Sequence, residues 1–132
     1  MYYLDTNICI YFLNGKYESV MRQIASIPAD EIRVPAIVKA ELLHGAYKSQ
    51  DKIRTVSNVE KFLSLFEIEA FADDMADVYA EVRAELDKEG TPIGPDDLII
   101  AATVLSKGGT LVTHNTKEFK RVKGLNVLDW VN

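Results

Sequence analysis

Residues 94–113 read GPDDLIIAATVLSKGGTLVT and decide the fold class of this 132-residue chain. The segment 98–107 is apolar on almost every side, which predicts a buried helix. The pair Gly108-Gly109 ends that helix, and the β-prone residues 110–113 follow it as a predicted strand. A buried helix that leads directly into a short strand is typical of a layered α/β fold.

The same alternation continues on both sides of this segment. Short β-prone runs predict further strands at 2–4, 32–34, 67–69 and 126–128. Apolar residues at helical spacing predict helices over 8–13, 20–27, from 38 onward, 51–65 and 73–89. Strands separated by helices pair in parallel through right-handed crossovers. The length of the chain and the lack of a linker predict a single domain over residues 1–132.

The composition narrows the possible functions. Fifteen basic residues against twenty acidic ones give a net charge of −5, which excludes a globally basic nucleic-acid binder but leaves room for a local basic patch. The one cysteine, Cys9, permits neither an intramolecular disulfide nor a metal site built on cysteines. The N-terminus lacks the pattern of a signal peptide, and no apolar run approaches the length of a membrane span. We therefore expect a cytoplasmic protein.

Three acids stand close to predicted apolar elements. Asp5 directly follows the first strand, Glu41 lies beside the apolar stripe of its helix, and Asp97 opens the most apolar helix. Asp5 and Asp97 have an alternative role as helix caps, and Glu41 has one as a solvated helix residue. If the fold brings the three together, however, each is a partly buried charge that needs a partner, and Lys and Arg are scarce nearby. Carboxylate oxygens select Mg²⁺ or Mn²⁺ over zinc, so a divalent cation is the expected partner.

Several motifs occur in a fixed order along the chain. They are Leu-Asp-Thr-Asn at 4–7, Ala-Glu-Leu-Leu-His-Gly at 40–45, Gly-Pro-Asp-Asp-Leu-Ile-Ile-Ala-Ala at 94–102, Leu-Val-Thr-His-Asn-Thr-Lys-Glu-Phe at 111–119 and Gly-Leu-Asn-Val-Leu-Asp-Trp at 124–130. In this order, and over nearly the whole length, the chain resembles a PIN-domain ribonuclease of the VapC toxin type. The resemblance implies a three-layer α/β/α PIN-like fold with a central, mostly parallel sheet of four to five strands.

The resemblance also implies an activity and its partners. The expected protein is a Mg²⁺-dependent endoribonuclease, with Mn²⁺ as a substitute metal, that forms the toxin half of a toxin–antitoxin pair. A VapB-type antitoxin would inhibit it. Metal-activated water would cleave RNA to leave 5′-phosphate and 3′-hydroxyl ends. The expected RNA is a tRNA, with initiator tRNA as one candidate. The amphipathic helices at 51–65 and 73–89 have apolar surface to spare, which predicts a homodimer and a groove for the antitoxin.

Carried over residue by residue, the resemblance assigns the site. Asp5, Glu41 and Asp97 fall on acidic positions of the family, and Asp5 and Asp97 are the expected metal ligands. The fourth acidic position falls on Asn115, which departs from the family pattern, and Glu118 one turn later is the candidate for the missing charge. The expected supporting residues are Thr6, Asn7, Asp96, Thr113 and Glu118. The basic stretch that follows the fourth strand supplies the expected substrate contacts, which are Lys117, Lys120 and Arg121.

Other functions fit part of this pattern. One is a structure-specific DNA nuclease, although the chain has no DNA-binding appendage. Another is a non-catalytic binding module whose acidic pocket holds the basic tail of a partner. A phosphotransferase with Asp5 as nucleophile is disfavoured because Asn7 stands where a second Asp is needed.

Overall fold

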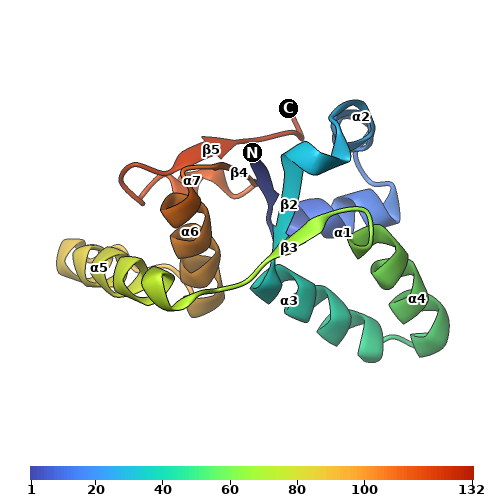
Figure 1. Ribbon diagram of the computed structural model, residues 1–132, viewed down its shortest axis with the longest axis horizontal. Helices are drawn as coiled ribbons and strands as arrows, with labels where there is room; N and C mark the ends of the chain where they lie inside the picture. Colours follow the sequence, from blue (N-terminus) through green and yellow to red (C-terminus); the bar gives the residue numbers. More distant parts are fainter.

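Five parallel strands form the centre of the protein, in the order β3-β2-β1-β4-β5. Figure 1 shows them in the computed structural model, which describes residues 1–132. The strands are β1 (Tyr2–Leu4), β2 (Ile32–Pro35), β3 (Glu67–Glu69), β4 (Thr110–Val112) and β5 (Asn126–Leu128). The predicted α/β class and parallel sheet are confirmed, and all five strands are parallel.

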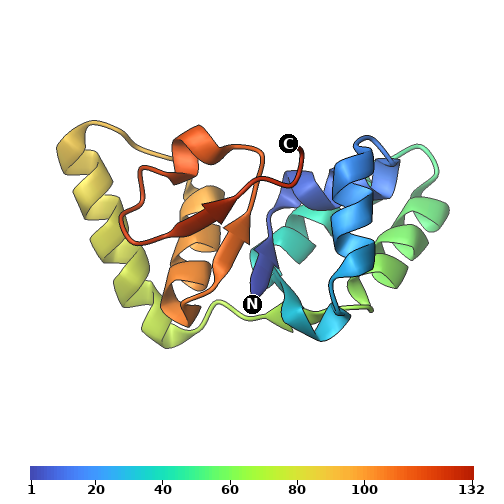
Figure 2. The same cartoon turned by 90° about the horizontal axis from the view of Figure 1, so that it is seen from above.

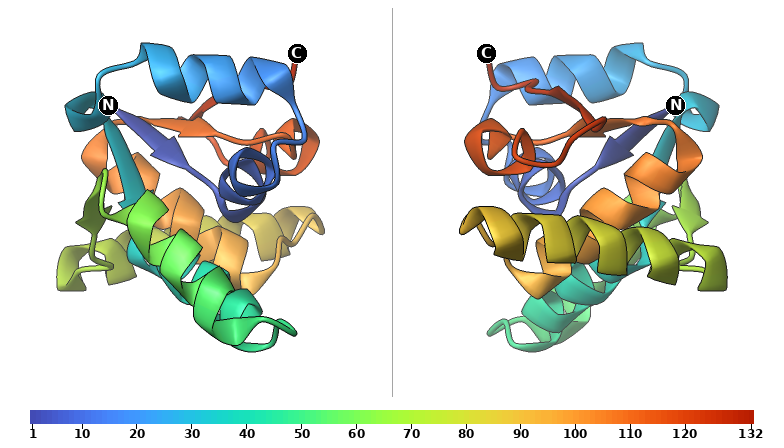
Figure 3. Two further views of the ribbon diagram at one scale, coloured as in Figure 1. Left: turned by 90° about the vertical axis from the view of Figure 1, so that its right-hand side faces the viewer. Right: turned by 90° about the vertical axis from the view of Figure 1, so that its left-hand side faces the viewer.

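Helices cover both faces of the sheet. They are α1 (Thr6–Asn14), α2 (Glu18–Ser26), α3 (Ala36–Tyr47), α4 (Lys52–Leu63), α5 (Asp73–Glu89), α6 (Pro95–Lys107) and α7 (Thr116–Phe119), with a 3₁₀ turn at Ala29–Glu31. Figure 3 shows α2 on one face of the sheet and α3 to α6 on the other, which confirms the three-layer arrangement. No helix is both long enough and apolar enough to cross a membrane.

The central strand β1 is held tightly on both sides. Tyr3 and Leu4 are buried, and Tyr3 pairs in register with Arg33 of β2 and Leu111 of β4. The chain before β4 approaches so closely that a Cβ atom added to Gly109 would lie 2.4 Å from the Tyr3 ring. Only glycine fits there. The Gly-Gly pair that ends α6 thus also lets β4 dock against β1.

Two short elements were not predicted from the sequence. The 3₁₀ turn at 29–31 and the four-residue helix α7 are too short to show a periodic pattern. The first helix begins at Thr6 rather than at residue 8, because Asp5 caps it. The predicted strand at 110–113 ends one residue early, at Val112.

The topology determines which edge of the sheet can hold a site. From β1 the chain first adds β2 and β3 on one side and later β4 and β5 on the other, as Figure 2 shows. The order of strands therefore reverses between β1 and β4. In open parallel sheets, ligands bind at the carboxyl ends of the strands at such a switch point. Asp5 and Thr113, the residues that follow these two strands, lie at this point.

Candidate active site

Asp5 is a buried carboxylate fixed at the start of α1. Its Oδ1 accepts a hydrogen bond of 2.9 Å from the backbone N–H of Ile8. Asp5 is only 5% exposed to solvent. Burial is the main cause that raises the pKa of Asp5 from 3.8 to about 6, and the nearby charges of Asp97 and Glu41 raise it further. Hydrogen bonds from the Thr113 side chain and the Ile8 amide oppose this rise. Asp5 therefore caps α1 and also carries a charge that its buried position at the switch point disfavours.

Asp97 and Glu41 approach Asp5 from α6 and α3, which cover the same face of the sheet. Asp97 lies in the first turn of α6, where it is half-buried, and Glu41 lies on α3. Burial raises the pKa of Asp97 to about 6, and the charges of Glu118, Glu41 and Asp96 add to the rise. The hydroxyl of Thr6 donates a hydrogen bond of 2.8 Å to Glu41 Oε1, which orients that carboxylate. Three segments distant in sequence therefore bring their carboxylates together.

Asn115 and Glu118 form a pair beside these acids. Asn115 Nδ2 donates to Glu118 Oε2 over 2.9 Å, and the Asn115 backbone N–H donates to the Thr113 hydroxyl over 3.0 Å. The Glu118 charge raises the pKa of Asp97 more strongly than the Glu41 charge does. The charge at this side of the site therefore comes from Glu118, with Asn115 as its hydrogen-bond donor.

The remaining predicted supporting residues lie less deeply in the site. Asp96 is exposed next to Asp97, and its charge contributes to the raised pKa of Asp97. Asn7 is exposed in the first turn of α1, and its side chain makes no hydrogen bond within the protein.

The donor set of the site suits a hard divalent cation. Asp5, Glu41, Asp97 and Glu118 offer only oxygen ligands, and no Lys or Arg lies within ion-pair distance of any of them. Burial is the main cause of the raised pKa values of Asp5 and Asp97, and the charges of neighbouring acids add to both shifts. No three Asp, Glu, His or Cys side chains already lie close enough to enclose a metal ion. The site therefore suits a divalent cation because its donors are all oxygens and because no cation of the protein balances its negative charge.

The cations of the stretch 107–123 differ in whether another group of the protein already binds them. Lys117 and Lys120, in and directly after α7, are exposed and make no ion pair. Arg121 is exposed but donates to the Pro92 carbonyl over 3.2 Å. Lys107 pairs with Glu69 of the outer strand β3, and Lys123 pairs with Glu85. The exposed, unpaired cations beside the site are therefore Lys117 and Lys120.

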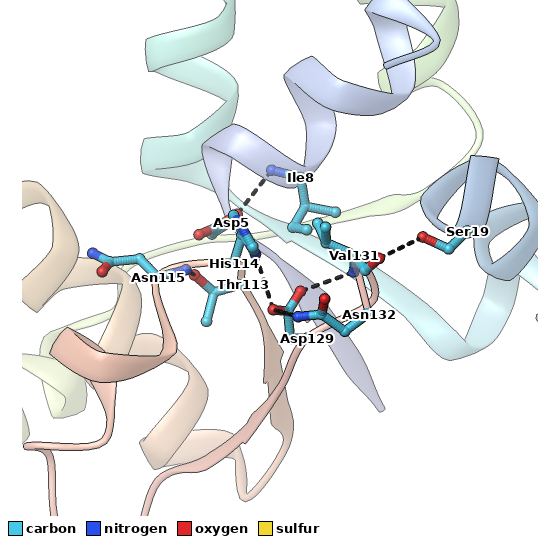
Figure 4. Close-up of polar contacts among 9 residues, drawn as sticks. All are labelled: Asp5, Ile8, Ser19, Thr113, His114, Asn115, Asp129, Val131 and Asn132. Carbon is cyan, nitrogen blue, oxygen red and sulfur yellow. Dashed lines mark hydrogen bonds and ion pairs between the residues drawn. The ribbon is translucent and has the colours of Figure 1, made fainter. Parts of the chain in front are cut away.

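The structure adds a contact that the sequence analysis did not find. His114 Nδ1 lies 2.9 Å from Asp129 Oδ2, so the turn after β4 is tied to the turn after β5. Figure 4 shows this pair with Asp5, Thr113 and Asn115 at the switch point. The two residues are fifteen positions apart in sequence, and only the pairing of β4 with β5 brings them together.

Known proteins resemble this chain in both sequence and fold. Residues 2–125 match the PIN domain family. The chain is 39% identical to ribonuclease VapC2 of Rickettsia felis over 131 residues, and the match covers 98% of each protein. It is 38% identical over 127 residues to the tRNA(fMet)-specific endonuclease VapC of Shigella flexneri, with 96% of each chain covered.

A solved structure agrees with these matches. The crystal structure of VapBC2 from Rickettsia felis bound to a promoter DNA fragment superposes with a TM-score of 0.92 at 38% identity, over 98% of each chain. The protein that this fold and acidic site define is a nuclease. The chain belongs to the PIN-domain family and, within it, to the VapC ribonucleases, as its motifs indicate.

Proposed function

We propose that this protein is the toxin of a toxin–antitoxin pair and that it cleaves a tRNA, with initiator tRNA as the first candidate. The observation that carries this proposal is the convergence of Asp5, Glu41 and Asp97 at the switch point without a neutralising cation. The name of the Shigella flexneri relative supports the choice of substrate. Such a substrate implies a cytoplasmic protein, and we propose that residues 1–132 form a single domain.

Mg²⁺ is the proposed cofactor, with Mn²⁺ as a substitute. Asp5 and Asp97 would hold it, with Glu41 and Glu118 completing the negative charge. When bound, the ion neutralises the scissile phosphate and makes water a stronger nucleophile. Attack by water rather than by the ribose 2′-hydroxyl leaves 5′-phosphate and 3′-hydroxyl ends.

The other residues of the site orient these carboxylates. Ile8 and Thr113 fix Asp5, and Thr6 fixes Glu41, so neither acid has to be ordered when substrate binds. Asn115 acts by orienting Glu118, which takes the fourth acidic position of the site. Asn7 and Asp96 are exposed at the mouth of the site, where we assign them a supporting role.

Substrate phosphates require positive charge near this acidic edge. Lys117 and Lys120 are exposed there and unpaired, so they are the proposed phosphate contacts. Arg121 keeps free guanidinium donors beside its bond to Pro92 and extends the same surface.

We propose a VapB-type antitoxin as the inhibitor, because solved relatives are VapBC complexes. An open groove of about 380 Å³ between α1, α3 and α4 leads to the site. Ile10, Leu13 and Leu42 give it apolar walls, and Glu41 lies at its polar end. An antitoxin segment with apolar residues followed by an arginine would fill the groove and neutralise the acids.

A homodimer is the proposed assembly of the toxin. Val78 and Val82 of α5 line an open hollow of about 350 Å³ with Leu105, which leaves apolar surface for a second copy. Light scattering at micromolar concentration tests this proposal, and a monomer mass would overturn it.

Cleavage of a bacterial tRNA pool by antitoxin-free protein tests the proposed activity. We expect discrete fragments with 5′-phosphate ends in Mg²⁺, and no fragments with EDTA or with Asp5→Asn. Fragments that persist with Asp5→Asn would reveal a contaminant or a misplaced site. Cleavage of duplex DNA instead of RNA would favour a DNA nuclease, and metal binding without any cleavage would favour a binding module.

A further inference from the structure

A second cluster of side chains lies at the same edge of the sheet as the acids. We call it the Lys16 cluster, and its members come from α1, the α1–α2 turn and the turns after β4 and β5: Tyr11, Lys16, Tyr17, His114 and Asp129. The two tyrosine rings meet edge to face at 4.9 Å, and the His114 ring lies 6.3 Å from Tyr11 and 6.1 Å from Tyr17.

Lys16 is a positioned cation without an acidic partner. Its Nζ lies 5.2 Å from the ring centroid of Tyr11 and 5.2 Å from that of Tyr17, and no carboxylate lies within ion-pair distance. Its backbone is fixed too, since its N–H donates to the Tyr11 carbonyl over 3.0 Å, directly after Gly15 in the left-handed conformation. An ordered, exposed ammonium group loses little entropy when it binds an anion.

His114 joins this cation to the acidic site. Its neighbours in sequence are Thr113, which hydrogen-bonds Asp5, and Asn115, which hydrogen-bonds Glu118. Asp129 holds its Nδ1, while the side chain remains 41% exposed and Nε2 has no hydrogen-bond partner in the protein. Asp129 is itself fixed by the Val131 backbone N–H at 2.8 Å. The imidazole therefore presents one oriented, unused polar edge beside the acids (Figure 4).

We propose that the Lys16 cluster is a subsite for a nucleotide that neighbours the cleaved bond of the RNA strand. Lys16 contacts the phosphate of this nucleotide, and Nε2 of His114 hydrogen-bonds its ribose 2′-hydroxyl. A 2′-hydroxyl is the group that distinguishes RNA from DNA, so this contact contributes to the choice of nucleic acid. The inference rests on the proposed cleavage of RNA. A purely structural role, in which the aromatic rings only join α1 to α2, predicts a loss of stability without a change in RNA affinity.

Lys16→Ala tests the phosphate contact, with Lys61→Ala as the matched control. Lys61 is an exposed, unpaired lysine near the end of α4, which leads to the amino edge of the sheet. RNA affinity is measured by fluorescence anisotropy in the Asp5→Asn background, and KM and kcat are measured in the active protein. For Lys16→Ala we expect Kd and KM to rise about fivefold at 0.1 M salt and the salt slope to fall by about 0.7, the value for one phosphate of a single strand. We expect kcat and the Lys61→Ala affinity to stay unchanged.

His114→Gln tests the ribose contact on RNA substrates that carry single 2′-deoxy substitutions. At one position near the cut, the substitution should weaken binding to the parent protein but not to His114→Gln. Equal effects of deoxy substitution on both proteins at every position, or Lys16→Ala and Lys61→Ala affinities that agree, would overturn the subsite. Failure of the parent protein both to bind and to cleave any RNA would overturn the proposed function itself.

Discussion

Two charged clusters of this protein, one on the outer strand β3 and one after the central strand β1, differ in how their acids are neutralised. In the first, Glu69 accepts a hydrogen bond of 2.8 Å from Arg33 and lies 3.7 Å from Lys107. In the second, Asp5 and Asp97 face further acids without any cation. The first cluster stabilises the fold because each charge has a partner. The second destabilises it until something positive binds, and this difference separates a structural cluster from a functional one.

The largest expected effect is on catalysis. Asp5→Asn keeps the acceptor that caps α1 but removes the central charge of the acidic site. We expect RNA cleavage to fall by about a hundredfold or more, because even losses outside the ligand shell of a metal cost 10–100-fold. Single-turnover cleavage of a tRNA substrate measures this, with Glu69→Gln as the control that should cleave normally per folded molecule. Cleavage by Asp5→Asn within tenfold of the parent would show that Asp5 is not a ligand.

The same substitution should stabilise the protein. Because the pKa of Asp5 is raised from 3.8 to about 6 in the native state, that state binds more protons than the unfolded chain between these values. The unfolding free energy of the metal-free protein should therefore decrease as pH rises from about 4 to about 6. At pH 7.5 Asp5→Asn should gain about 3 kcal/mol, from a shift of about 2 units at 1.36 kcal/mol each, and the gain should vanish below pH 4. Urea denaturation at both pH values decides this, and a loss of stability at pH 7.5 would contradict it.

Removal of a paired acid should have the opposite sign. Glu69→Gln keeps an oxygen that accepts from the Tyr3 hydroxyl, but it removes the charge that pairs with Arg33 and Lys107 and leaves Arg33 with only the exposed Glu67. We expect the unfolding free energy to decrease by about 2 kcal/mol, typical of a hydrogen bond to a charged group. Urea denaturation at pH 7.5 measures it. A stabilised Glu69→Gln variant would remove the distinction between the two clusters.

The smallest effect should come from an ion pair that belongs to neither cluster. Arg22 and Glu18 lie 3.4 Å apart on the surface of α2, with side chains 70% and 90% exposed. Such pairs contribute about 0.3–0.5 kcal/mol, so Arg22→Ala should leave the thermal midpoint nearly unchanged. A shift as large as that of Glu69→Gln would mean that an exposed ion pair stabilises this protein as much as the partly buried one around Glu69.

The sequence was sufficient for the elements and for the main acids. Short β-prone runs located every strand, and apolar residues at helical spacing located all helices except the shortest. Asp5 and Asp97 were identifiable because Asp5 directly precedes an apolar helix and Asp97 lies in the first turn of another. Glu41 depended on the resemblance to the family, since its own position reads equally well as a solvated helix residue.

The contacts between side chains depended on the folded chain. Nothing in the sequence links Thr6 to Glu41 or His114 to Asp129, because each pair forms only when helices and strands pack. The five cations between 107 and 123 form one run in the sequence. In the structure Lys107 pairs with Glu69 of β3, because α6 runs back along the sheet before β4 begins. Lys16 stands alone in the sequence, and only the rings beneath it mark it as ordered.

The central place of β1 in the sheet has a consequence for the cell that makes this protein. Residues 2–4 are translated well before their partner strand β4. While β4 is still inside the ribosome, Asp5 has neither Thr113 beside it nor the strand that fixes its position. A nascent chain therefore carries an incomplete site. The ribosome that synthesises this nuclease is not exposed to its activity until β4 has been translated and has paired with β1.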